Sequence, residues 1–380
     1  MAKDTEKGEY EIKAHQLYLS HLPTWIALLK ENKGVWRSNF RQTALISLIS
    51  LATQPFQMLE NALYAKKIKD TSFEEQPPVF ILGHWRSGTT HLHYFLTRDP
   101  QFGYLTYYQS FFPNIALIGG NKLKYVLRPF MPKKRPMDNV TMSLDLPNED
   151  DPPMATFTKH CAANGFFFPR NESYFNKYNL FKGISPEEKK GWQEGFMKMM
   201  AKISIACGGN KQLVLKSPPN TGRVKELLEL FPNAKFVYIH RNPYRVYAST
   251  YRLYKTVSST QFLQDFTNKE IKEKIYYYYE TIIQKYLDER HLIPKGNLIE
   301  IGYNDLENRP LEMMKDVYDT LGLEGYENAL PKFEAYLNGI GSYKKNSFSL
   351  DKQTIANIKR RWKMGLDAWN YDLPDNLVEK

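Results

Sequence analysis

A glycine-bracketed loop at residues 83–90 carries the first residues whose types and spacing could do chemistry. Its sequence, Gly-His-Trp-Arg-Ser-Gly-Thr-Thr, follows a short apolar run at 79–82 and precedes apolar residues at helical spacing. A strand, a glycine loop and a helix in this order point backbone N–H groups and a helix N-terminus at one anion. The spacing is nearly that of a Walker A loop, but Thr89 stands where the lysine should be. The loop is therefore predicted to hold a phosphate, and the missing lysine argues against an ordinary ATPase or GTPase.

Three more polar positions follow predicted strands. Lys216 follows the apolar run at 212–215, and Arg241 comes directly after the run at 236–239. The guanidinium of Arg241 offers a fork of donors suited to a second phosphate, and Ser249 adds a hydroxyl on the next helix. An acidic run between prolines, Glu149-Asp150-Asp151, is usually a solvated turn, but near a reaction centre it could supply a base.

The elements that must position these residues alternate along the chain. Short apolar runs at 79–82, 212–215, 236–239 and 298–301 predict buried strands, and helical spacing follows each of them. This alternation predicts right-handed βαβ units, and hence an α/β fold with a central parallel sheet of four to five strands flanked by helices. Residues 101–210 predict loops and helices instead.

Helical extensions are predicted on both sides of this core. We expect a helical extension at 1–76, an α/β core at 77–325 with insertions at 101–210, and a C-terminal helical segment at 326–380. Two amphipathic segments in the first extension are followed by Lys66, Lys67 and Lys69. Packing against the core is the favoured interpretation of these helices, and contact with a membrane interface is the alternative.

Composition narrows the class of protein and of partner. The 380 residues carry a formal net charge of +11, which favours an anionic partner such as a nucleotide, an acidic lipid or a nucleic acid. Cys161 and Cys207 are isolated, so no metal site is expected and a reducing compartment fits. The start lacks an apolar signal segment, and the longest apolar stretch is too short to span a bilayer. A cytoplasmic location, or a peripheral one at the inner membrane face, is the resulting prediction.

Four pieces of the chain, taken in order, resemble the PAPS-dependent sulfotransferases with a P-loop-like fold. The loop at 83–90 looks like that family's loop for the 5′-phosphosulfate, and Arg241 with Ser249 looks like its 3′-phosphate motif. Tyr303-Asn304-Asp305-Leu306 resembles its Y-x-D-L region, where the tyrosine lies near the adenine. Leu215-Lys216-Ser217-Pro218 is similar to the second-strand lysine motif of its bacterial branch. The resemblance covers residues 77–325.

The resemblance implies PAPS as donor, PAP as product and no metal. Catalysis would rest on positioning and on fixed cations beside the 5′-phosphate, for which Arg86 and Lys216 are the candidates. Pro218 and Asn220 stand where relatives carry a histidine base, so Glu149 and Asp150, ahead of Asp151, are the predicted bases. The residues assigned to the donor are Arg86, Ser87, Gly88, Thr89, Thr90, His91, Arg241, Ser249, Tyr303, Lys344 and Lys345.

The acceptor is predicted from two aromatic groups at 102–112 and 166–178, whose irregular spacing fits pocket walls. They favour a lipophilic alcohol or phenol, and the chain broadly resembles bacterial enzymes that include the sterol-sulfonating type of gut bacteria. A steroid or sterol hydroxyl is therefore the leading hypothesis, with no nucleic-acid partner. Two alternatives stay open, namely a P-loop small-molecule kinase and a basic membrane- or nucleic-acid-binding protein without catalysis.

Overall fold

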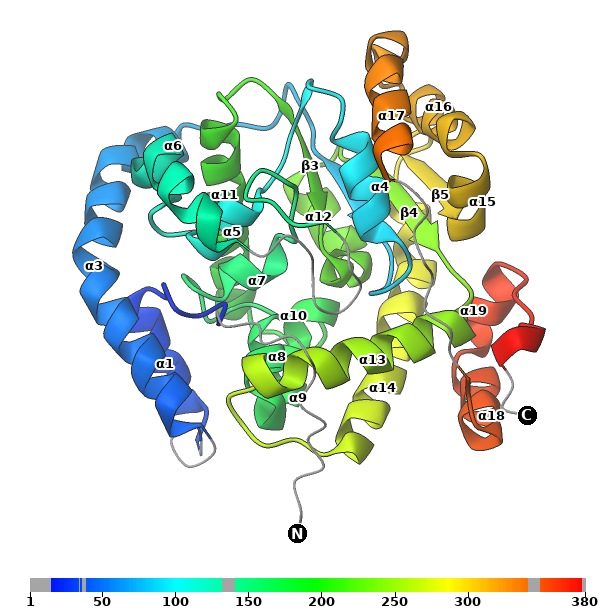
Figure 1. The fold of residues 1–380 in the computed structure, drawn as a ribbon, viewed down its shortest axis with the longest axis horizontal. Helices are drawn as coiled ribbons and strands as arrows, with labels where there is room; N and C mark the ends of the chain where they lie inside the picture. Colours follow the sequence, from blue (N-terminus) through cyan, green and yellow to red (C-terminus); the bar gives the residue numbers. More distant parts are fainter. Residues whose placement is uncertain (1–14, 34, 36–38, 132–140, 341–348, 378–380) are drawn as a thin grey trace.

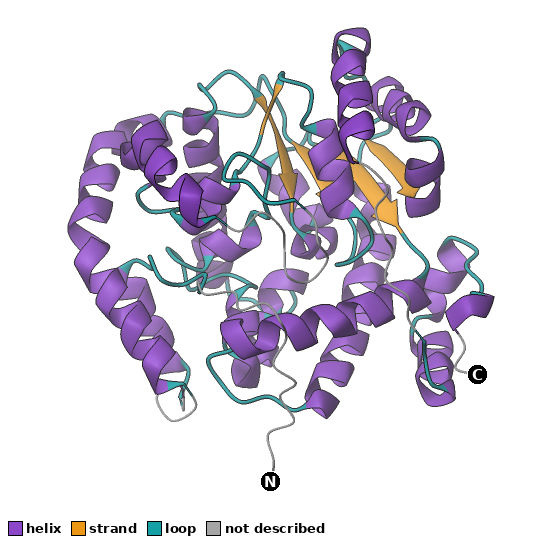
Figure 2. Ribbon diagram, viewed as in Figure 1, coloured by secondary structure: helices purple, strands orange, loops and turns teal. Residues whose placement is uncertain are grey.

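One five-stranded parallel sheet lies at the centre of the computed structural model, which describes residues 15–33, 35, 39–131, 141–340 and 349–377 (Figures 1 and 2). The strands are β1 (Val79–Leu82), β2 (Phe102–Gly103), β3 (Gln212–Lys216), β4 (Lys235–His240) and β5 (Leu298–Gly302). Their order is β2-β3-β1-β4-β5, and every neighbouring pair is parallel. All carboxyl ends therefore meet at one edge, where the residues that follow β1, β3, β4 and β5 can converge.

Four of these strands are the four that the sequence predicts, and the α/β class with four to five parallel strands is confirmed. The strand at 102–103 lies in a region predicted as loops and helices. Phe102 pairs with Gln212, and Gly103 pairs with Leu213. Two residues are too few to show any alternation, so only pairing with β3 reveals this strand.

Alternate residues of each strand enter two different cores. Val79 and Ile81 of β1 face one apolar cluster, and Phe80 and Leu82 face the other, with all four side chains fully buried. Because successive side chains of a strand point to opposite faces, the sheet is the middle of three layers. A sheet covered on both faces explains why the strands are apolar throughout.

The first layer covers the face of Val79 and Ile81 and lies at the upper right of Figure 1. Its helices are α4 (Thr89–Leu96), α15 (Tyr303–Asn308), α16 (Pro310–Leu321) and α17 (Tyr326–Ile340). Pro310 opens α16, and Gly322 ends it at a φ of 57°, a left-handed conformation that suits glycine.

The opposite layer and the C-terminal helices complete the core. The opposite layer contains α11 (Pro186–Ala206), η3 (Pro218–Gly222), α12 (Val224–Leu230) and α14 (Asn268–Glu289), followed by η4 (Arg290–Leu292). A third apolar cluster joins α14 to α13 (Pro243–Gln261), α18 (Lys352–Arg361), α19 (Lys363–Ala368) and η5 (Asp375–Leu377). The C-terminal helices therefore pack on the same long helix that supports the sheet.

The insertion and the N-terminal helices lie on the left of Figure 1. The insertion contains α5 (Tyr107–Phe111), α6 (Ala116–Leu127), η1 (Arg128–Phe130), α7 (Asp151–Met154), α8 (Asn164–Phe167), η2 (Pro169–Asn171), α9 (Glu172–Phe175) and α10 (Lys177–Leu180). The N-terminal helices are α1 (Leu22–Glu31) and α3 (Phe40–Lys69). Trp25 and Leu28 of α1 enter the core, as expected for helices packed on the domain. The division of the chain at 76 and 325 stays a prediction.

Substitution of Phe333 tests whether α17 is part of the cooperative core. Its side chain is fully buried, and its ring lies 5.1 Å from that of Phe95. Because the substitution leaves a cavity, Phe333→Ala should lower the free energy of unfolding by about 3–5 kcal/mol in chemical denaturation. The matched control is Phe130→Ala, because Phe130 is 81% exposed and its loss should change stability by under about 0.5 kcal/mol. Equal effects of the two substitutions would show that α17 contributes nothing to the core.

Candidate functional site

The glycine loop leaves β1 at the carboxyl edge of the sheet and enters α4 at Thr89. Gly88 precedes the helix at a φ of 99°, and Arg86 takes a φ of 69°, which is unusual for a residue with a side chain. The amide of Gly83 donates to Thr221 Oγ1 at 2.8 Å. The first N–H groups of α4 have no partner within the helix, so the loop and helix start can bind an anion, as the sequence predicts.

Tyr303 and Arg241, which follow β5 and β4, contact the loop at the same edge of the sheet. A Cβ atom on Gly88 would lie only 2.4 Å from the ring of Tyr303, so this close approach requires glycine. The guanidinium of Arg241 lies over the same ring, 4.0 Å from its centroid, and Nη1 donates to the carbonyl of Arg86 at 3.1 Å. The segments that follow β1, β4 and β5 therefore contact one another.

Arg86, Arg241 and Ser249 form a second cationic group, which we call the arginine cluster. Nε of Arg86 donates to Ser249 Oγ at 2.9 Å. Nε of Arg241 is buried and finds no hydrogen-bond partner among the described residues. A buried guanidinium N–H without a partner is costly unless a ligand accepts from it. The arginine cluster therefore fits a second phosphate, and the role of Arg86 beside the 5′-phosphate stays a prediction.

Lys216 joins the loop to the acidic turn. Its ammonium lies 2.8 Å from Glu149 Oε1 and 3.5 Å from Thr90 Oγ1, and its side chain is 2% exposed. The carboxylate of Glu149 is 24% exposed. The structure thus brings a buried cation, a reachable carboxylate and a hydroxyl of the anion loop together at one point.

The other two carboxylates of the acidic turn are buried. Asp150 accepts from the amide of Asn220 at 2.9 Å, and burial raises the pKa of Asp150 to about 6. Asp151 forms an ion pair with Arg223 at 2.6 Å, and both side chains are buried. Asn220 also accepts from Arg223 at 2.9 Å. These contacts hold the turn that presents Glu149, so Asp150 and Asp151 lie behind the site and not on its surface.

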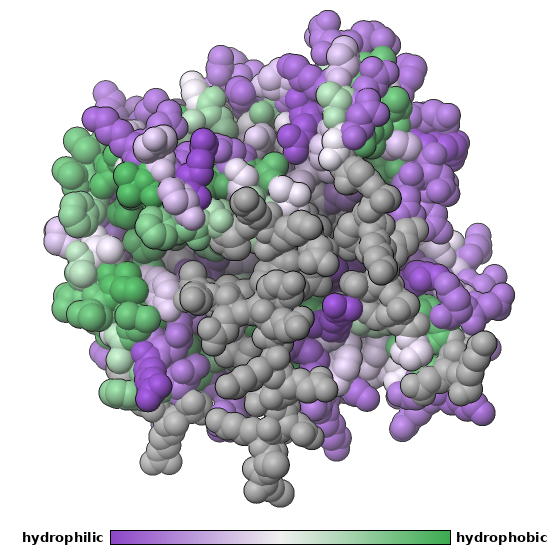
Figure 3. Space-filling view, viewed as in Figure 1, coloured by the Kyte–Doolittle hydropathy of each residue, from purple (hydrophilic) through white to green (hydrophobic). Residues whose placement is uncertain are grey.

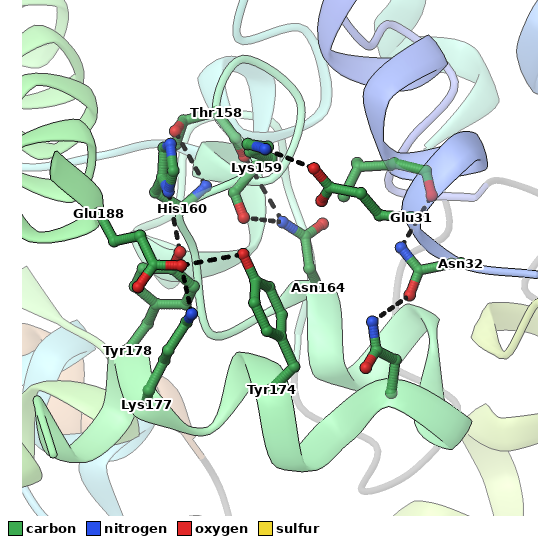
Figure 4. A network of polar contacts seen from close by, with 12 residues as sticks. Glu31, Asn32, Thr158, Lys159, His160, Asn164, Tyr174, Lys177, Tyr178 and Glu188 are labelled. Atoms are coloured by element: carbon green, nitrogen blue, oxygen red, sulfur yellow. Dashed lines mark hydrogen bonds and ion pairs between the residues drawn. The ribbon is translucent and has the colours of Figure 1, made fainter. Parts of the chain in front are cut away.

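Arg223 connects the acidic turn to a polar network around the insertion. Figure 4 shows this network, including Tyr178 and His160. Its Nε donates to the carbonyl of Tyr178 at 2.8 Å, and the hydroxyl of Tyr178 lies 2.8 Å from His160 Nδ1. The next residue back, Lys159, forms an ion pair with Glu31 at the end of α1. The N-terminal helix, the insertion and the acidic turn are therefore held together by one run of contacts.

Three histidines lie near the loop. His91 stacks on Tyr336 of α17, with its Nδ1 3.3 Å from the tyrosine hydroxyl, and its assignment to the donor stays a prediction. His93 is buried, and burial followed by the charge of Lys216 holds its pKa well below the usual range. Burial lowers the pKa of His84 to about 4. We infer that all three rings are neutral at pH 7.

Sequence reasoning missed three residues that position the site. Thr221 accepts from the loop, Arg223 holds the acidic turn, and Trp362 lies beside His84 with ring centroids 6.4 Å apart. Thr221 and Arg223 follow the Lys216 motif by only a few positions, but nothing in their types marks them as partners. Lys344 and Lys345, which the resemblance assigns to the donor, lie outside the described residues.

The two aromatic groups differ in position, and the second one needs a correction. Phe168, Phe175 and Tyr178 are fully buried in the main core, so most of this group is core and not a pocket wall. Consecutive short helices bury residues at irregular spacing, which imitates a pocket pattern. The first group lies beside the acidic turn, because the amide of Tyr107 donates to Leu146 at 3.0 Å. Phe102, Tyr107 and Tyr108 of the first group are buried as well. Only its partly exposed members, Tyr104, Phe111 and Phe112, keep the predicted role of acceptor lining.

No cluster of three or more His, Cys, Asp or Glu side chains within the described ranges could hold a metal ion. Cys161 is buried and Cys207 half-buried, and neither forms a disulfide bond. The site is therefore built from cations, hydroxyls, backbone N–H groups and one reachable carboxylate.

Comparison with known proteins relates this geometry to one family. The model of the sulfotransferase family matches residues 77–328. An omega-hydroxy-beta-dihydromenaquinone-9 sulfotransferase, Stf3, from Mycobacterium bovis is 29% identical over 349 residues, which cover 92% of this chain and 89% of that protein. Stf3 from Mycobacterium tuberculosis matches to the same extent.

Two crystal structures share the fold. Sulfotransferase STF9 from Mycobacterium avium superposes with a TM-score of 0.66 at 15% identity, covering 93% of this chain and 98% of that one. Sulfotransferase STF1 from Mycobacterium tuberculosis gives a TM-score of 0.61 at 15% identity, covering 93% and 91%. The predicted P-loop-like three-layer fold is thereby confirmed.

The buried carboxyl of Asp150 makes stability depend on pH in a defined direction. Its pKa is about 6 in the folded protein against 3.8 ordinarily, so the folded state holds more protons between these values. Stability is therefore lost as the pH rises from about 4 to 6. The unfolding free energy of Asp150→Asn, measured against wild type by denaturation at several pH values, should rise by about 2–4 kcal/mol between pH 4 and 7. The control is Asp319→Asn, which removes an exposed ion pair of α16, and its difference in unfolding free energy from wild type should not change with pH. A difference for Asp150→Asn that does not change with pH would contradict the raised pKa.

Proposed function

The chain belongs to the sulfotransferase family, and from this premise we propose that it moves the sulfuryl group of PAPS onto the hydroxyl of a lipophilic acceptor, with Glu149 as general base. The sequence-based prediction of a PAPS-dependent sulfotransferase that releases PAP is confirmed at the level of the family. The kinase and the non-catalytic binder are not favoured by this match. The acceptor class and the residue roles are the proposal.

One observation carries the proposed mechanism, namely the position of the Lys216 ammonium between Glu149 and Thr90. The donor supplies a sulfuryl group whose bond to the 5′-phosphate oxygen breaks as the bond to the acceptor oxygen forms. Lys216 can stabilise the negative charge that develops on the phosphate side, because a fixed cation in a desolvated site needs no reorganisation. Glu149 can take the acceptor proton on the other side of the same cation.

Glu149 suits the role of base better than its neighbours. A base must come within hydrogen-bond distance of the acceptor hydroxyl, and Glu149 alone of the three acidic residues is partly exposed. Asp150 is fully buried against Asn220, and Asp151 is engaged by Arg223. We assign positioning roles to Asp150 and Asp151, since both hold the turn that presents Glu149.

Two groups of residues suit the two phosphates of the donor. The backbone of 86–90 and the hydroxyls of Thr89 and Thr90 suit the 5′-phosphosulfate, next to Lys216. The arginine cluster suits the 3′-phosphate, and the unpartnered Nε of Arg241 offers a donor there. Tyr303 lies between the loop and Arg241, and we assign it to the adenine of the donor. These assignments are consistent with a donor that carries phosphates at both ends of its ribose.

The acceptor is best described as a lipophilic alcohol. Tyr107 and Phe111 lie with ring centroids 5.9 Å apart on α5, and an isolated bridge from Thr106 to Pro147 attaches this helix to the acidic turn. Stf3, the relative at 29% identity, is named for a menaquinone-type lipid alcohol. A steroid or sterol hydroxyl remains our specific hypothesis, and an isoprenoid alcohol is the competing acceptor. Mass spectrometry after incubation with PAPS and panels of sterols, isoprenoid alcohols, phenols and sugars tests the class, and sulfation confined to sugars would refute it.

Substitution of Arg241 tests the 3′-phosphate site separately from the loop. A charge-assisted hydrogen bond contributes about 1.5–3 kcal/mol, so Arg241→Ala should weaken PAP binding by roughly 10- to 100-fold in calorimetry. Adenosine 5′-phosphosulfate lacks the 3′-phosphate and serves as the matched ligand, so its affinity should change far less. Equal losses for the two ligands would mean that Arg241 acts only by bracing the loop.

Substitution of Glu149 tests the base. Glu149→Gln removes the proton acceptor but keeps an oxygen for Lys216, so kcat should fall by about 10²- to 10⁴-fold while PAP affinity is kept. The control is Glu312→Gln on the exposed face of α16, which should leave both measurements unchanged. Activity of Glu149→Gln near the wild-type level would show that Glu149 only orients Lys216.

A further inference from the structure

The helix α3 buries its polar side and exposes its apolar side, the reverse of an ordinary surface helix. Its buried positions include Thr43, Ser50, Gln57 and Glu60, with Ile46 the only large apolar side chain among its fully buried positions. A helix that packs on a soluble domain normally buries its apolar stripe and exposes its polar one. Here the polar stripe faces the protein, so burial against the core does not account for the apolar residues of the helix.

The protein bonds part of the buried polar stripe, whereas Ser50 Oγ and Gln57 Oε1 find no hydrogen-bond partner among the described residues. Gln57 donates to Thr53 Oγ1 at 3.0 Å, and Glu60 forms a buried ion pair with Lys202 of α11. The same carboxylate accepts from the backbone amides of Leu117 and Ile118, at 2.8 Å and 3.1 Å, at the start of α6. Glu60 therefore fixes α3 and α6 relative to each other and holds the polar stripe inward.

The outward side of these two helices and of η1 carries most of the exposed large apolar side chains, and we call it the docking face. Of the fourteen large apolar side chains that the described residues leave exposed, eleven lie on α3, α6 or η1. They are Phe40, Leu45, Leu48, Leu51, Phe56, Met58, Leu59, Leu63, Tyr125, Val126 and Phe130. Figure 3 shows apolar residues gathered along the left edge of the molecule, over α3. Apolar surface concentrated on one side of a protein marks a site of interaction.

The exposed charges that α3, α6 and η1 themselves contribute are basic, although Lys124 and Arg128 are paired with Asp145. Glu60 is the only acidic residue of α3, and it is buried, whereas Arg41, Lys66, Lys67 and Lys69 are exposed. The sequence of 116–130, which forms α6 and η1, contains basic residues and no acidic one. Apolar side chains bordered by basic ones are complementary to a bilayer that carries anionic headgroups.

We propose that the docking face binds the surface of an anionic lipid bilayer. The helix would lie in the interface with its leucines among the acyl chains and its lysines at the headgroups. A second copy of the chain is the weaker occupant, because self-association would bring two sets of lysines together. Within the described part of the chain, no helix is long and apolar enough to cross a membrane. Contact along the surface is the mode that this pattern supports.

Vesicle co-sedimentation with the full chain tests the proposal without donor or acceptor. Wild type should bind phosphatidylcholine vesicles that contain phosphatidylglycerol, and added salt should weaken the binding. The triple substitution Leu48→Ser, Leu51→Ser and Leu59→Ser should lower the partition coefficient by about 100-fold, because three exposed leucines leave the interface. The triple substitution Lys66→Gln, Lys67→Gln and Lys69→Gln should remove most of the preference for phosphatidylglycerol.

The control is Tyr277→Ser with Leu292→Ser, two of the three exposed large apolar residues that lie outside the docking face, and it should bind vesicles like wild type. Absence of wild-type binding, or equal binding by the leucine variant, would overturn the proposal. A wild-type dimer in sedimentation that the leucine variant abolishes, without vesicle binding, would assign the face to a second copy. Turnover of a water-soluble phenol should be unchanged in the leucine variant, so failure of docking and failure of the proposed function are distinguishable.

Discussion

A single desolvated ammonium lies between the anion loop and the acidic turn. Lys216 ends the strand next to β1, so the parallel pairing of β3 with β1 brings its side chain to the anion loop. There it contacts Thr90 on one side and Glu149 on the other. An ammonium buried in this way needs its carboxylate partner, because an unpaired charge in a protein interior is costly. The remainder of the site serves to hold these three groups in contact.

The supports come from segments far apart in the sequence. Thr221 ties the loop to the segment after β3, and Arg241 with Tyr303 braces it from β4 and β5. The acidic turn is fixed from below by the ion pair of Asp151 with Arg223. Since loops carry chemistry only where a scaffold fixes them, the parallel sheet and this buried pair are what make the turn a usable part of the site.

The sequence predicts the sheet and the anion loop well because both depend on local patterns. Apolar runs and glycine spacing locate four strands and the loop, and the motif after β4 locates Arg241. The two-residue strand β2 escapes prediction because it exists only through pairing with β3. Arg223 escapes because its partners come from the insertion, and the core aromatics near 168–178 were misassigned because irregular short helices hide their burial. Contacts distant in sequence decide each of these cases.

The buried pair of Asp151 and Arg223 also limits how this protein can change over generations. Loss of either partner alone leaves a buried charge and costs about 3–5 kcal/mol, a large share of a typical domain's stability. The two positions can therefore vary only together, and the neighbouring Glu149 is held within the same constraint. The helices α5 and α6 make no contact with this pair among the hydrogen bonds and ion pairs of the described residues. Substitutions on α5 and α6 are accordingly expected to leave this buried pair in place.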